Sequence, residues 1–347
     1  VVATGENSNG QCDVADWGNI SAIAAGFDHT IGLRSNGTVV AAGSNGNGKC
    51  EVSDWKEIVA VAGGFDHTVG LRADGTALAV GFAIYGACDV EQWTDIVQIT
   101  CGYDHTVGLR SDGTVVAVGY NLDGECDVSN WKDIIAIAAG GYHTLGLRAD
   151  GTVVATGENS NGQCDVADWG NISAIAAGFD HTIGLRSNGT VIAAGSNGNG
   201  KCEVGEWKDI VAVDGGFDHT VGLKADGTAV ATGFAIYGAC DVEQWTDITE
   251  IACGDDHTIG LHYDGTVIAA GSNSKGQCDV EEWTKVRTGG EQEAAPEATG
   301  EPEAATEETE APTQAPTEAD TEPAPEATED GDEKASDVAE SQPEKTA

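Results

Sequence analysis

The chain has 347 residues, and its 58 acidic side chains outnumber 16 basic ones, which gives a formal net charge of −42 at pH 7. Nucleic-acid binding depends on basic side chains that neutralise phosphates, so this charge argues against a nucleic-acid partner. The sequence contains no long apolar run and no sorting motif. We therefore expect no membrane insertion by this chain, and any anchor would lie outside it.

A repeat of 38 residues extends over most of the sequence. Each unit contains a His-Thr pair, and eight tryptophans keep the same period. The histidines of these pairs are His29, His67, His105, His143, His181, His219 and His257. Residues 1–39 are identical to residues 153–191, so a block of four units has been duplicated. The sequence therefore holds seven complete units and an additional half unit at its start.

Within one unit, three short runs rich in Val, Ile and Ala predict β-strands. In the second unit these runs are 58–64, 67–73 and 76–81. The Asp-Gly pair between the last two runs predicts a tight hairpin in which both central residues take positive φ. We expect a fourth short strand near 88–93. Four strands in each unit of about 40 residues are typical of a blade, so the predicted fold is an all-β, seven-bladed β-propeller over residues 1–287.

The two ends of the repeat array raise separate questions. Residues 1–5 and 266–271 both have the sequence of a third strand, and both could fill one place in the last blade, so one of them is surplus. Because the sequence contains no methionine, we expect a processed protein or a piece of a longer array.

The composition changes at residue 288. Residues 288–347 hold all seven prolines, with 19 acidic and 2 basic side chains. Such a segment lacks the apolar surface that offsets the entropy of ordering, so we expect it to be disordered. It is either a Thr-Pro-Glu stalk that spaces the propeller from a surface or an interdomain linker. Without it, residues 1–287 keep 39 acidic and 14 basic side chains, a net charge of −25.

The segment "IAAGFDHTIGLRSNGTVVAAGSNGNGKC" (23–50) and its six relatives resemble the repeats of the regulator of chromosome condensation family. The resemblance covers residues 1–287 and implies a seven-bladed propeller. The units are short, and the usual Trp-Gly tryptophan is replaced, for example by Ala42 and Val80. Both features are more similar to the short bacterial branch, which includes a secreted inhibitor of β-lactamases.

The strongest candidate binding residues immediately precede the histidines, in the loops that join the first and second strands. We expect all seven loops on one face around the axis, here called the ring face. The candidates are Phe27 and Asp28, Phe65 and Asp66, Tyr103 and Asp104, Tyr142, Phe179 and Asp180, Phe217 and Asp218, and Asp255 and Asp256. An aromatic group and a carboxylate in each loop would suit a basic, partly apolar protein surface. Alternatively, the aromatic rings pack under the loops and the aspartates cap turns, or several aspartates form a divalent-cation site.

A second candidate surface lies in the loops after two third strands, where large apolar groups replace Ser and Asn. These loop patches are Phe82, Ile84 and Tyr85, and their copies Phe234, Ile236 and Tyr237. Exposed apolar clusters indicate contacts with a partner. The same groups would also fit against adjacent blades.

The remaining recurrent residues favour structural roles. A neutral imidazole both donates and accepts, so each histidine is expected to tie strands within a blade, and each tryptophan to anchor blade packing. Eight cysteines share one position in every unit and are expected to be small packing groups. Disulfides between Cys88 and Cys101 and between Cys240 and Cys253 are an alternative, whereas no ligand pair spaced for zinc is present. The segment 43–50 matches a phosphate loop only in part, because Cys50 stands where Ser or Thr is required.

These observations lead to one functional hypothesis. We expect a non-catalytic, extracellular or cell-surface interaction module that binds an unidentified protein with a basic or aromatic-accepting surface. The chain is expected to be a monomer and to need no cofactor and no metal ion. The alternatives are a protein inhibitor of a secreted enzyme and an enzyme with a pocket at the propeller mouth.

Overall fold

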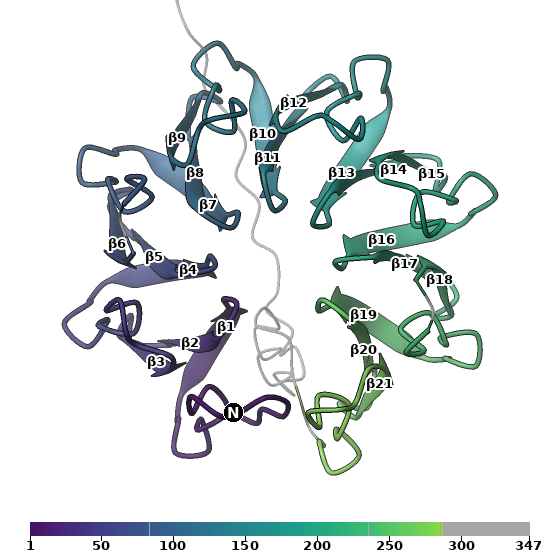
Figure 1. Ribbon diagram of the computed structural model, residues 1–347, viewed down its shortest axis with the longest axis horizontal. Helices are drawn as coiled ribbons and strands as arrows, with labels where there is room; N and C mark the ends of the chain where they lie inside the picture. The colour runs from purple at the N-terminus through teal and green to yellow at the C-terminus, as the bar shows by residue number, and fades with distance from the viewer. Residues whose placement is uncertain (83, 235, 285, 287–347) are drawn as a thin grey trace, which may run out of the picture. The chain divides into compact units, whose positions relative to one another are not determined.

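The computed structural model describes residues 1–286 except Ala83, Ala235 and Lys285. The segment predicted to be disordered, 288–347, lies outside the described residues. Within them, 21 strands form seven antiparallel sheets of three strands each, arranged around an axis (Figure 1). The predicted all-β, seven-bladed propeller is confirmed, with one sheet in each 38-residue unit.

Each sheet runs outward from the axis, and its three strands follow one another in sequence (Figure 1). The innermost strands are β1 (Ile20–Ala25), β4 (Ile58–Gly63), β7 (Ile96–Cys101), β10 (Ile134–Ala139), β13 (Ile172–Ala177), β16 (Ile210–Gly215) and β19 (Ile248–Cys253). The middle strands are β2 (His29–Arg34), β5 (His67–Arg72), β8 (His105–Arg110), β11 (His143–Arg148), β14 (His181–Arg186), β17 (His219–Lys224) and β20 (His257–His262). The outer strands are β3 (Val39–Gly43), β6 (Ala77–Gly81), β9 (Val115–Gly119), β12 (Val153–Gly157), β15 (Val191–Gly195), β18 (Ala229–Gly233) and β21 (Val267–Gly271).

The predicted fourth strand near 88–93 was wrong, because this segment folds into consecutive turns. The backbone N–H of Val90 donates to the carbonyl of Cys88 at 2.9 Å, and that of Trp93 donates to Val90 at 2.9 Å. Local bonds therefore occupy backbone groups that a fourth strand would need. Val90 and Trp93 are nevertheless buried, so the segment serves as a packing layer.

The hairpin between the middle and outer strands also differs from the prediction. Gly75 takes a φ of +81°, whereas Asp74 is not among the residues with positive φ. The Asp74 carboxylate instead accepts hydrogen bonds from the backbone N–H of Thr76 at 2.9 Å and from its hydroxyl at 2.6 Å. One glycine therefore provides the left-handed residue of the turn, and the aspartate holds the turn through its side chain.

The tryptophans anchor the blades, as the sequence predicted. Trp55, which precedes β4, lies against Gly70 in the middle of β5, and a Cβ added to Gly70 would come within 2.6 Å of the indole ring. The same pairing recurs in each blade. The repeated glycine in "HTxGLR" is thus explained by the close approach of the indole.

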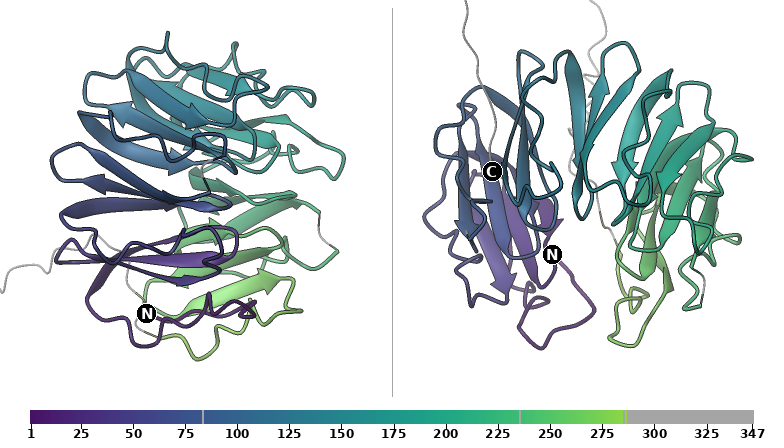
Figure 2. Two further views of the ribbon diagram at one scale, coloured as in Figure 1. Left: turned by 60° about the vertical axis from the view of Figure 1, so that its left-hand side comes forward. Right: turned by 45° about the horizontal axis from the view of Figure 1, so that its top comes forward.

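The apolar core is divided among the junctions between consecutive blades. Six clusters of buried residues lie at the six junctions from the first blade to the seventh. Neighbouring inner strands contact one another from β1 through β19, but no comparable contact joins β19 to β1. In the described residues, the ring therefore has a seam between its first and last blades (Figure 2).

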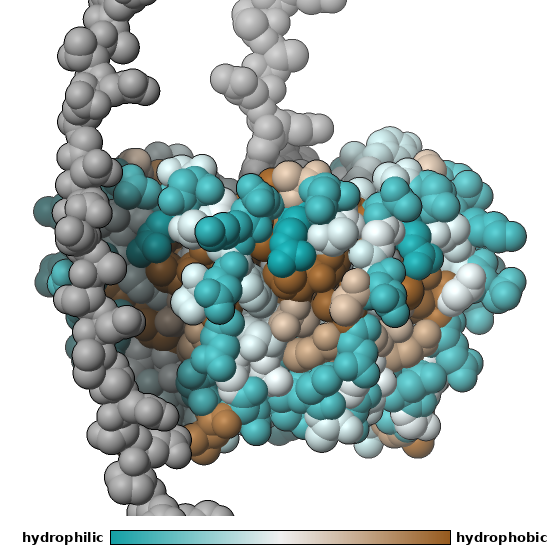
Figure 3. All heavy atoms as spheres, turned by 90° about the horizontal axis from the view of Figure 1, so that it is seen from above, coloured by the Kyte–Doolittle hydropathy of each residue, from teal (hydrophilic) through white to brown (hydrophobic). Residues whose placement is uncertain are grey.

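One side of the outer surface of the ring can be followed in a space-filling view. Seen from the side of β10–β12, polar residues cover most of this surface, and apolar residues lie in recesses between them (Figure 3). No helix in the described part of the chain is long and apolar enough to span a membrane.

Candidate functional site

The repeated histidines form a ladder that ties consecutive blades together. The Nε2 atom of His143 lies 3.0 Å from Oγ1 of Thr182 in the next blade, and the Thr182 hydroxyl donates to the carbonyl of Gln163 at 2.7 Å. Six His-Thr pairs of this kind are present, each linking residues 39 positions apart. The structural role predicted for these histidines is confirmed, but the bond joins two blades and not two strands of one blade.

The geometry of the ladder defines the protonation state of the histidines. The threonine hydroxyl donates its proton to a backbone carbonyl, so its oxygen accepts a hydrogen bond from the histidine Nε2–H. The histidine Nδ1 therefore carries the lone pair. The Nδ1 atoms of His29, His105, His143 and His181 are buried and have no partner in the described structure. Burial lowers the pKa of His143 to about 4 and that of His105 to about 3. These histidines are neutral in the folded protein at pH 7.

Aromatic side chains of the ring face stack on one another across blades. The ring centroids of Phe27 and Phe65 are 4.3 Å apart, those of Phe65 and Tyr103 are 5.1 Å apart, and those of Phe179 and Phe217 are 4.3 Å apart. The two groups meet because Tyr103 and Phe179 approach to 5.0 Å. The five rings therefore form one continuous aromatic surface.

In the fourth blade, a glycine replaces the aromatic residue of the ring face. Gly141 occupies its aromatic position, and a Cβ there would lie 2.6 Å from the ring of Phe179. This glycine lets Tyr103 and Phe179 come together across it. The next residue, Tyr142, stands where other blades have aspartate, and its ring lies 5.6 Å from that of Tyr103 and 5.8 Å from that of Phe179.

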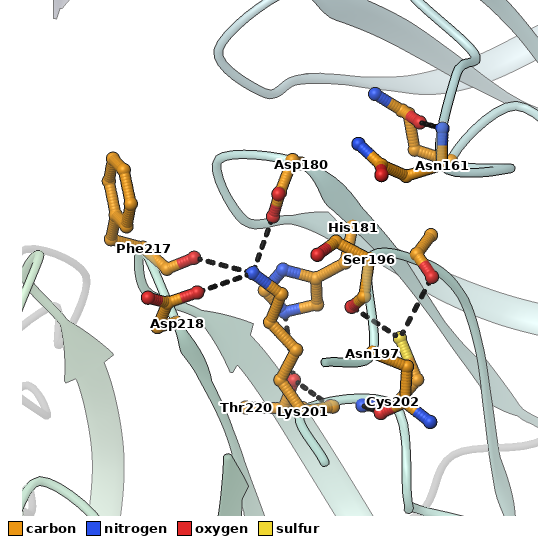
Figure 4. A network of polar contacts seen from close by, with 12 residues as sticks. Asn161, Asp180, His181, Ser196, Asn197, Lys201, Cys202, Phe217, Asp218 and Thr220 are labelled. Atoms are coloured by element: carbon orange, nitrogen blue, oxygen red, sulfur yellow. Dashed lines mark hydrogen bonds and ion pairs between the residues drawn. The ribbon is translucent and has the colours of Figure 1, made fainter. Parts of the chain in front are cut away.

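Two lysines bridge carboxylates of the ring face. Lys201 Nζ lies 2.5 Å from Asp180 and 2.6 Å from Asp218, and it also donates to the carbonyl of Phe217 at 3.2 Å (Figure 4). Lys49 bridges Asp28, at 2.6 Å, and Asp66 in the same way. Burial acts to lower the pKa of Lys201, but its bonds to the two aspartates outweigh this effect and raise the pKa above its ordinary value.

The ring face is therefore not uniformly acidic. Four of its aspartates are paired with the two buried lysines, whereas Asp104, Asp255 and Asp256 have no ion-pair partner among the described residues. Burial, and then the charge of Asp256, raises the pKa of Asp255. Burial, and then the charge of Asp66, raises the pKa of Asp104. No group of three or more His, Cys, Asp or Glu side chains in the described residues is arranged to hold a metal ion.

The ring face surrounds the mouth of a central cavity of about 600 Å³. The seven loops between inner and middle strands line the cavity, together with residues of the N-terminal segment such as Thr4 and Glu6. Much of the lining is Ala and Gly, because Ala-Gly or Gly-Gly lies at the end of five inner strands, whereas β7 and β19 end in Cys-Gly. Phe27 is the most open of the aromatic groups, with 57% of its surface exposed.

The two loop patches differ in their surroundings. Ile84 and Tyr85 are 72% and 50% exposed, and their copies Ile236 and Tyr237 are similarly open, whereas Phe82 and Phe234 are half-buried. The ring of Tyr85 lies 5.2 Å from that of Tyr120, which in turn lies 5.8 Å from that of Tyr142. The first patch is thus continuous with the aromatic surface, while the rings of Phe234 and Tyr237 contact each other at 6.1 Å.

Sequence reasoning missed Tyr120, Lys49 and Lys201. Tyr120 occupies the same place after the outer strand as Phe82 and Phe234, which was the signal available for it. The sequence around Lys49 was interpreted only as a partial phosphate-loop match. Their signal was a cation at a position that holds Gln, Ala or Glu in the other units, on a chain rich in aspartate.

The cysteines are free thiols. All ten are half-buried. Because none of them is bonded to another, the predicted alternative of disulfides between Cys88 and Cys101 and between Cys240 and Cys253 is not realised. In most units the thiol of the repeated cysteine donates to the carbonyl of the residue six positions earlier, as in the 3.5 Å contact from Cys50 to Ser44. Burial raises the pKa of Cys101 to about 12, which keeps it protonated.

Seven sheets around an axis, joined by a ladder of side-chain bonds between units, define a repeat-built β-propeller. The family model described as the regulator of chromosome condensation (RCC1) repeat matches residues 20–49, 96–125, 134–163, 172–201 and 248–277. Five of the repeats of this propeller therefore match the RCC1 repeat family, as the sequence resemblance indicated. Comparison with curated protein sequences yields no match.

Solved structures support the fold. The chain is similar to the Crinkly WD40 ectodomain of the Arabidopsis thaliana receptor kinase ACR4, with a TM-score of 0.55, 22% identity and coverage of 74% of this chain and 98% of the other. It is also similar to the ectodomain of the Physcomitrella patens receptor kinase CR4, with a TM-score of 0.55, 20% identity and 72% coverage of each chain. Prp20p of Saccharomyces cerevisiae matches with a TM-score of 0.52, 19% identity and coverage of 72% and 81%.

Proposed function

We propose that this propeller is a non-catalytic protein-interaction module that binds a basic protein partner through its ring face. The observation that supports the proposal is the continuous aromatic surface formed by Phe27, Phe65, Tyr103, Phe179 and Phe217. Aromatic side chains contribute a large share of binding energy in protein interfaces. A surface of this kind, on a ring with a net charge of −25, suits a partner that brings cationic groups.

The paired and unpaired aspartates divide the proposed surface into two parts. Asp28, Asp66, Asp180 and Asp218 already have buried lysine partners, so they contribute little attraction to an incoming cation. Asp104, Asp255 and Asp256 lack such partners in the described structure and are the carboxylates that we assign to the protein partner. The basic groups of the partner would therefore approach the third and seventh blades, which carry these carboxylates.

The proposed location is extracellular or at the cell surface. The similarity to two receptor-kinase ectodomains supports this location. Yeast Prp20p binds Gsp1p and histones, and a second structure holds it in complex with Kap60. These interactions of Prp20p support protein binding as a use of this fold. An inhibitor of a secreted enzyme would use the same ring face, and it would differ in holding one enzyme so that its substrate is excluded.

The test is affinity capture from the surface and culture proteins of the source organism, with the full chain as bait. One variant carries Phe27→Ala and Phe65→Ala, and a second carries Asp255→Asn and Asp256→Asn. The control is Tyr263→Ala, which removes an aromatic ring that is 76% exposed in the hairpin between β20 and β21, away from the ring face.

We expect the control to bind like the unmodified chain. Each aromatic substitution should weaken binding by about 1 kcal/mol or more, which is roughly fivefold. The two-aspartate variant should lose most of its affinity at low salt and less at high salt, because the removed charges are screened there. Equal capture by all four proteins would show that the partner does not use this surface.

A further inference from the structure

The seam between the first and last blades leaves the ends of the His-Thr ladder unpaired. His257, in the seventh blade, has no Thr partner among the described residues, and Thr30, in the first blade, has no His partner. In the six other positions of each type, the two groups meet across a junction. His257 and Thr30 both line the central cavity. One donor and one acceptor therefore face the seam.

Apolar side chains at the seam are more exposed than their buried or half-buried equivalents at the other junctions. Ile23 of β1 is 64% exposed, whereas its equivalents Ile99 and Ile137 are 9% and 4% exposed. On the opposite side, Ile259 of β20 is half-buried, although its equivalents in the other six blades are completely buried. Both sides of the seam thus present the same apolar surfaces that pack together at the other junctions.

The N-terminal segment holds the place of one strand within this seam. Thr4 Oγ1 donates to the carbonyl of Gly276 at 2.6 Å, and this bond repeats the 2.7 Å bond from Thr156 in β12 to Gly124. Because residues 1–39 copy 153–191, Val1–Gly5 corresponds to β12. A strand like β11 does not lie beside it in the described residues, and Val1 and Val2 are 37% and 51% exposed.

We propose that the seam binds a β-hairpin of one further unit of this repeat, composed of its inner and middle strands. The register follows from the pairing of β11 with β12, in which His143 lies opposite Gly157, Thr144 opposite Thr156 and Leu147 opposite Val153. The incoming His would lie opposite Gly5, the Thr opposite Thr4 and the Leu opposite Val1. Val1–Gly5 would become the outer strand of this added sheet.

The hydrogen bonds of the ladder specify the incoming sequence. The incoming His would donate to Thr30, and the incoming Thr would accept from His257, so that the six existing pairs become eight. A generic apolar peptide would cover Ile23 and Ile259 but would leave the two polar groups unpaired. Addition of strands to an open sheet edge is an established mode of peptide recognition, with backbone bonds giving affinity and side chains giving specificity.

The first experiment joins the hairpin to the full chain. A copy of residues 134–152 is placed before Val1, which reproduces the junction between Thr152 and Val153. We expect slower amide hydrogen exchange at Val1–Gly5 and in β1 and β20, and a higher urea midpoint. A matched extension carries His143→Gln and Thr144→Val. It should give less than half of the increase in the midpoint, because it cannot extend the ladder.

The second experiment supplies the hairpin as a separate molecule. A synthetic peptide with the sequence 134–152 is added to the full chain, and binding is followed by fluorescence anisotropy of the labelled peptide. We expect saturable binding that weakens at least fivefold with His257→Gln or with Thr30→Val in the chain. A scrambled peptide should not bind.

Three results would overturn the proposal. The first is an extension whose amides exchange as fast as those of the free peptide. The second is binding that is indifferent to His257→Gln and Thr30→Val, which would show that the ladder does not select the occupant. The third is a dimer of the chain alone in which β1 and β20 are already protected, which would show that a second copy covers the seam.

Discussion

The threonine of each ladder position should be a stability determinant at the six junctions and neutral at the seam. Thr144 is completely buried, and its hydroxyl bonds both to His105 Nε2, at 3.0 Å, and to the carbonyl of Glu125, at 2.8 Å. Thr144→Val keeps the shape of the side chain but leaves a buried N–H and a buried carbonyl without partners. Each of these two unsatisfied buried groups costs about 1–3 kcal/mol, so we expect a loss of about 2–6 kcal/mol in the free energy of unfolding.

The matched control is Thr30→Val, which changes the same residue of the repeat where no His partner is present in the described residues. A substitution without such partners is expected to change stability by less than about 0.5 kcal/mol. The assay is equilibrium urea unfolding followed by tryptophan fluorescence, with the midpoint and slope compared among the three proteins. Equal midpoints for the two variants would refute the argument that the ladder bonds stabilise the junctions.

Three further predictions rest on other contacts. Lys201→Met should lower the free energy of unfolding by about 1–3 kcal/mol in urea titrations, because Asp180 and Asp218 lose their common partner; the exposed Lys208→Met is the control and should have little effect. Gly146→Ala should destabilise the protein by about 2 kcal/mol or more in the same assay, since the added Cβ would lie 2.8 Å from the Trp131 ring. The control is Gly170→Ala, whose Cβ meets no atom within 4 Å and should leave the stability unchanged. The free energy of unfolding should also fall steeply between pH 6.5 and about 4. The folded protein holds the pKa of the ladder histidines low, near 4 for His67 and His143, so in this window the unfolded chain binds protons that the folded chain does not. Each histidine then costs about 1.4 kcal/mol per pH unit in this window, and an unchanged urea midpoint from pH 7.5 to 5.5 would contradict this reading.

The repeat period made most of the fold predictable. Alternating apolar residues and the Asp-Gly or Asn-Gly pairs located the three strands of each blade to within about two residues. The fourth strand was predicted because blades usually contain four. It failed because the short turns around Val90 satisfy their own backbone, a local feature that the pattern of apolar residues does not encode.

The site was predictable only where it depended on position within the unit. The aromatic residues before the histidines were recognised as one ring, because equivalent loops of a propeller emerge on the same face. Which of their carboxylates are neutralised could not be read, because Lys201 reaches Asp180 and Asp218 on two different blades. The ladder was hidden for the same reason. The histidine and its threonine partner are 39 residues apart, one more than the period, so the pair looks like a neighbouring His-Thr within one strand.

The expectation that two chain ends compete for one strand position was also wrong. Residues 266–271 include β21, the outer strand of the seventh blade, and Val1–Gly5 occupies a separate place beyond it. Sequence identity between Val1–Gly5 and β12 indicated an outer strand but not the blade to which it belongs. That assignment required the contact between Thr4 and Gly276.

The ladder also explains how this propeller varies its ring face without losing its fold. The threonine hydroxyl of each junction donates to the backbone carbonyl of the residue before the repeated cysteine, so the bond does not depend on that residue's side chain. This position is Lys49, Ala87, Glu125 or Gln163 in successive units, and each side chain starts from the same fixed backbone. The lysines at this position neutralise two pairs of aspartates, while alanine or glutamate leaves neighbouring carboxylates without a cation. The side chain at this position can therefore change the charge of the ring face, while its backbone carbonyl keeps the hydrogen bond that joins the blades. The proposed binding surface thus varies separately from the interactions that hold the blades together.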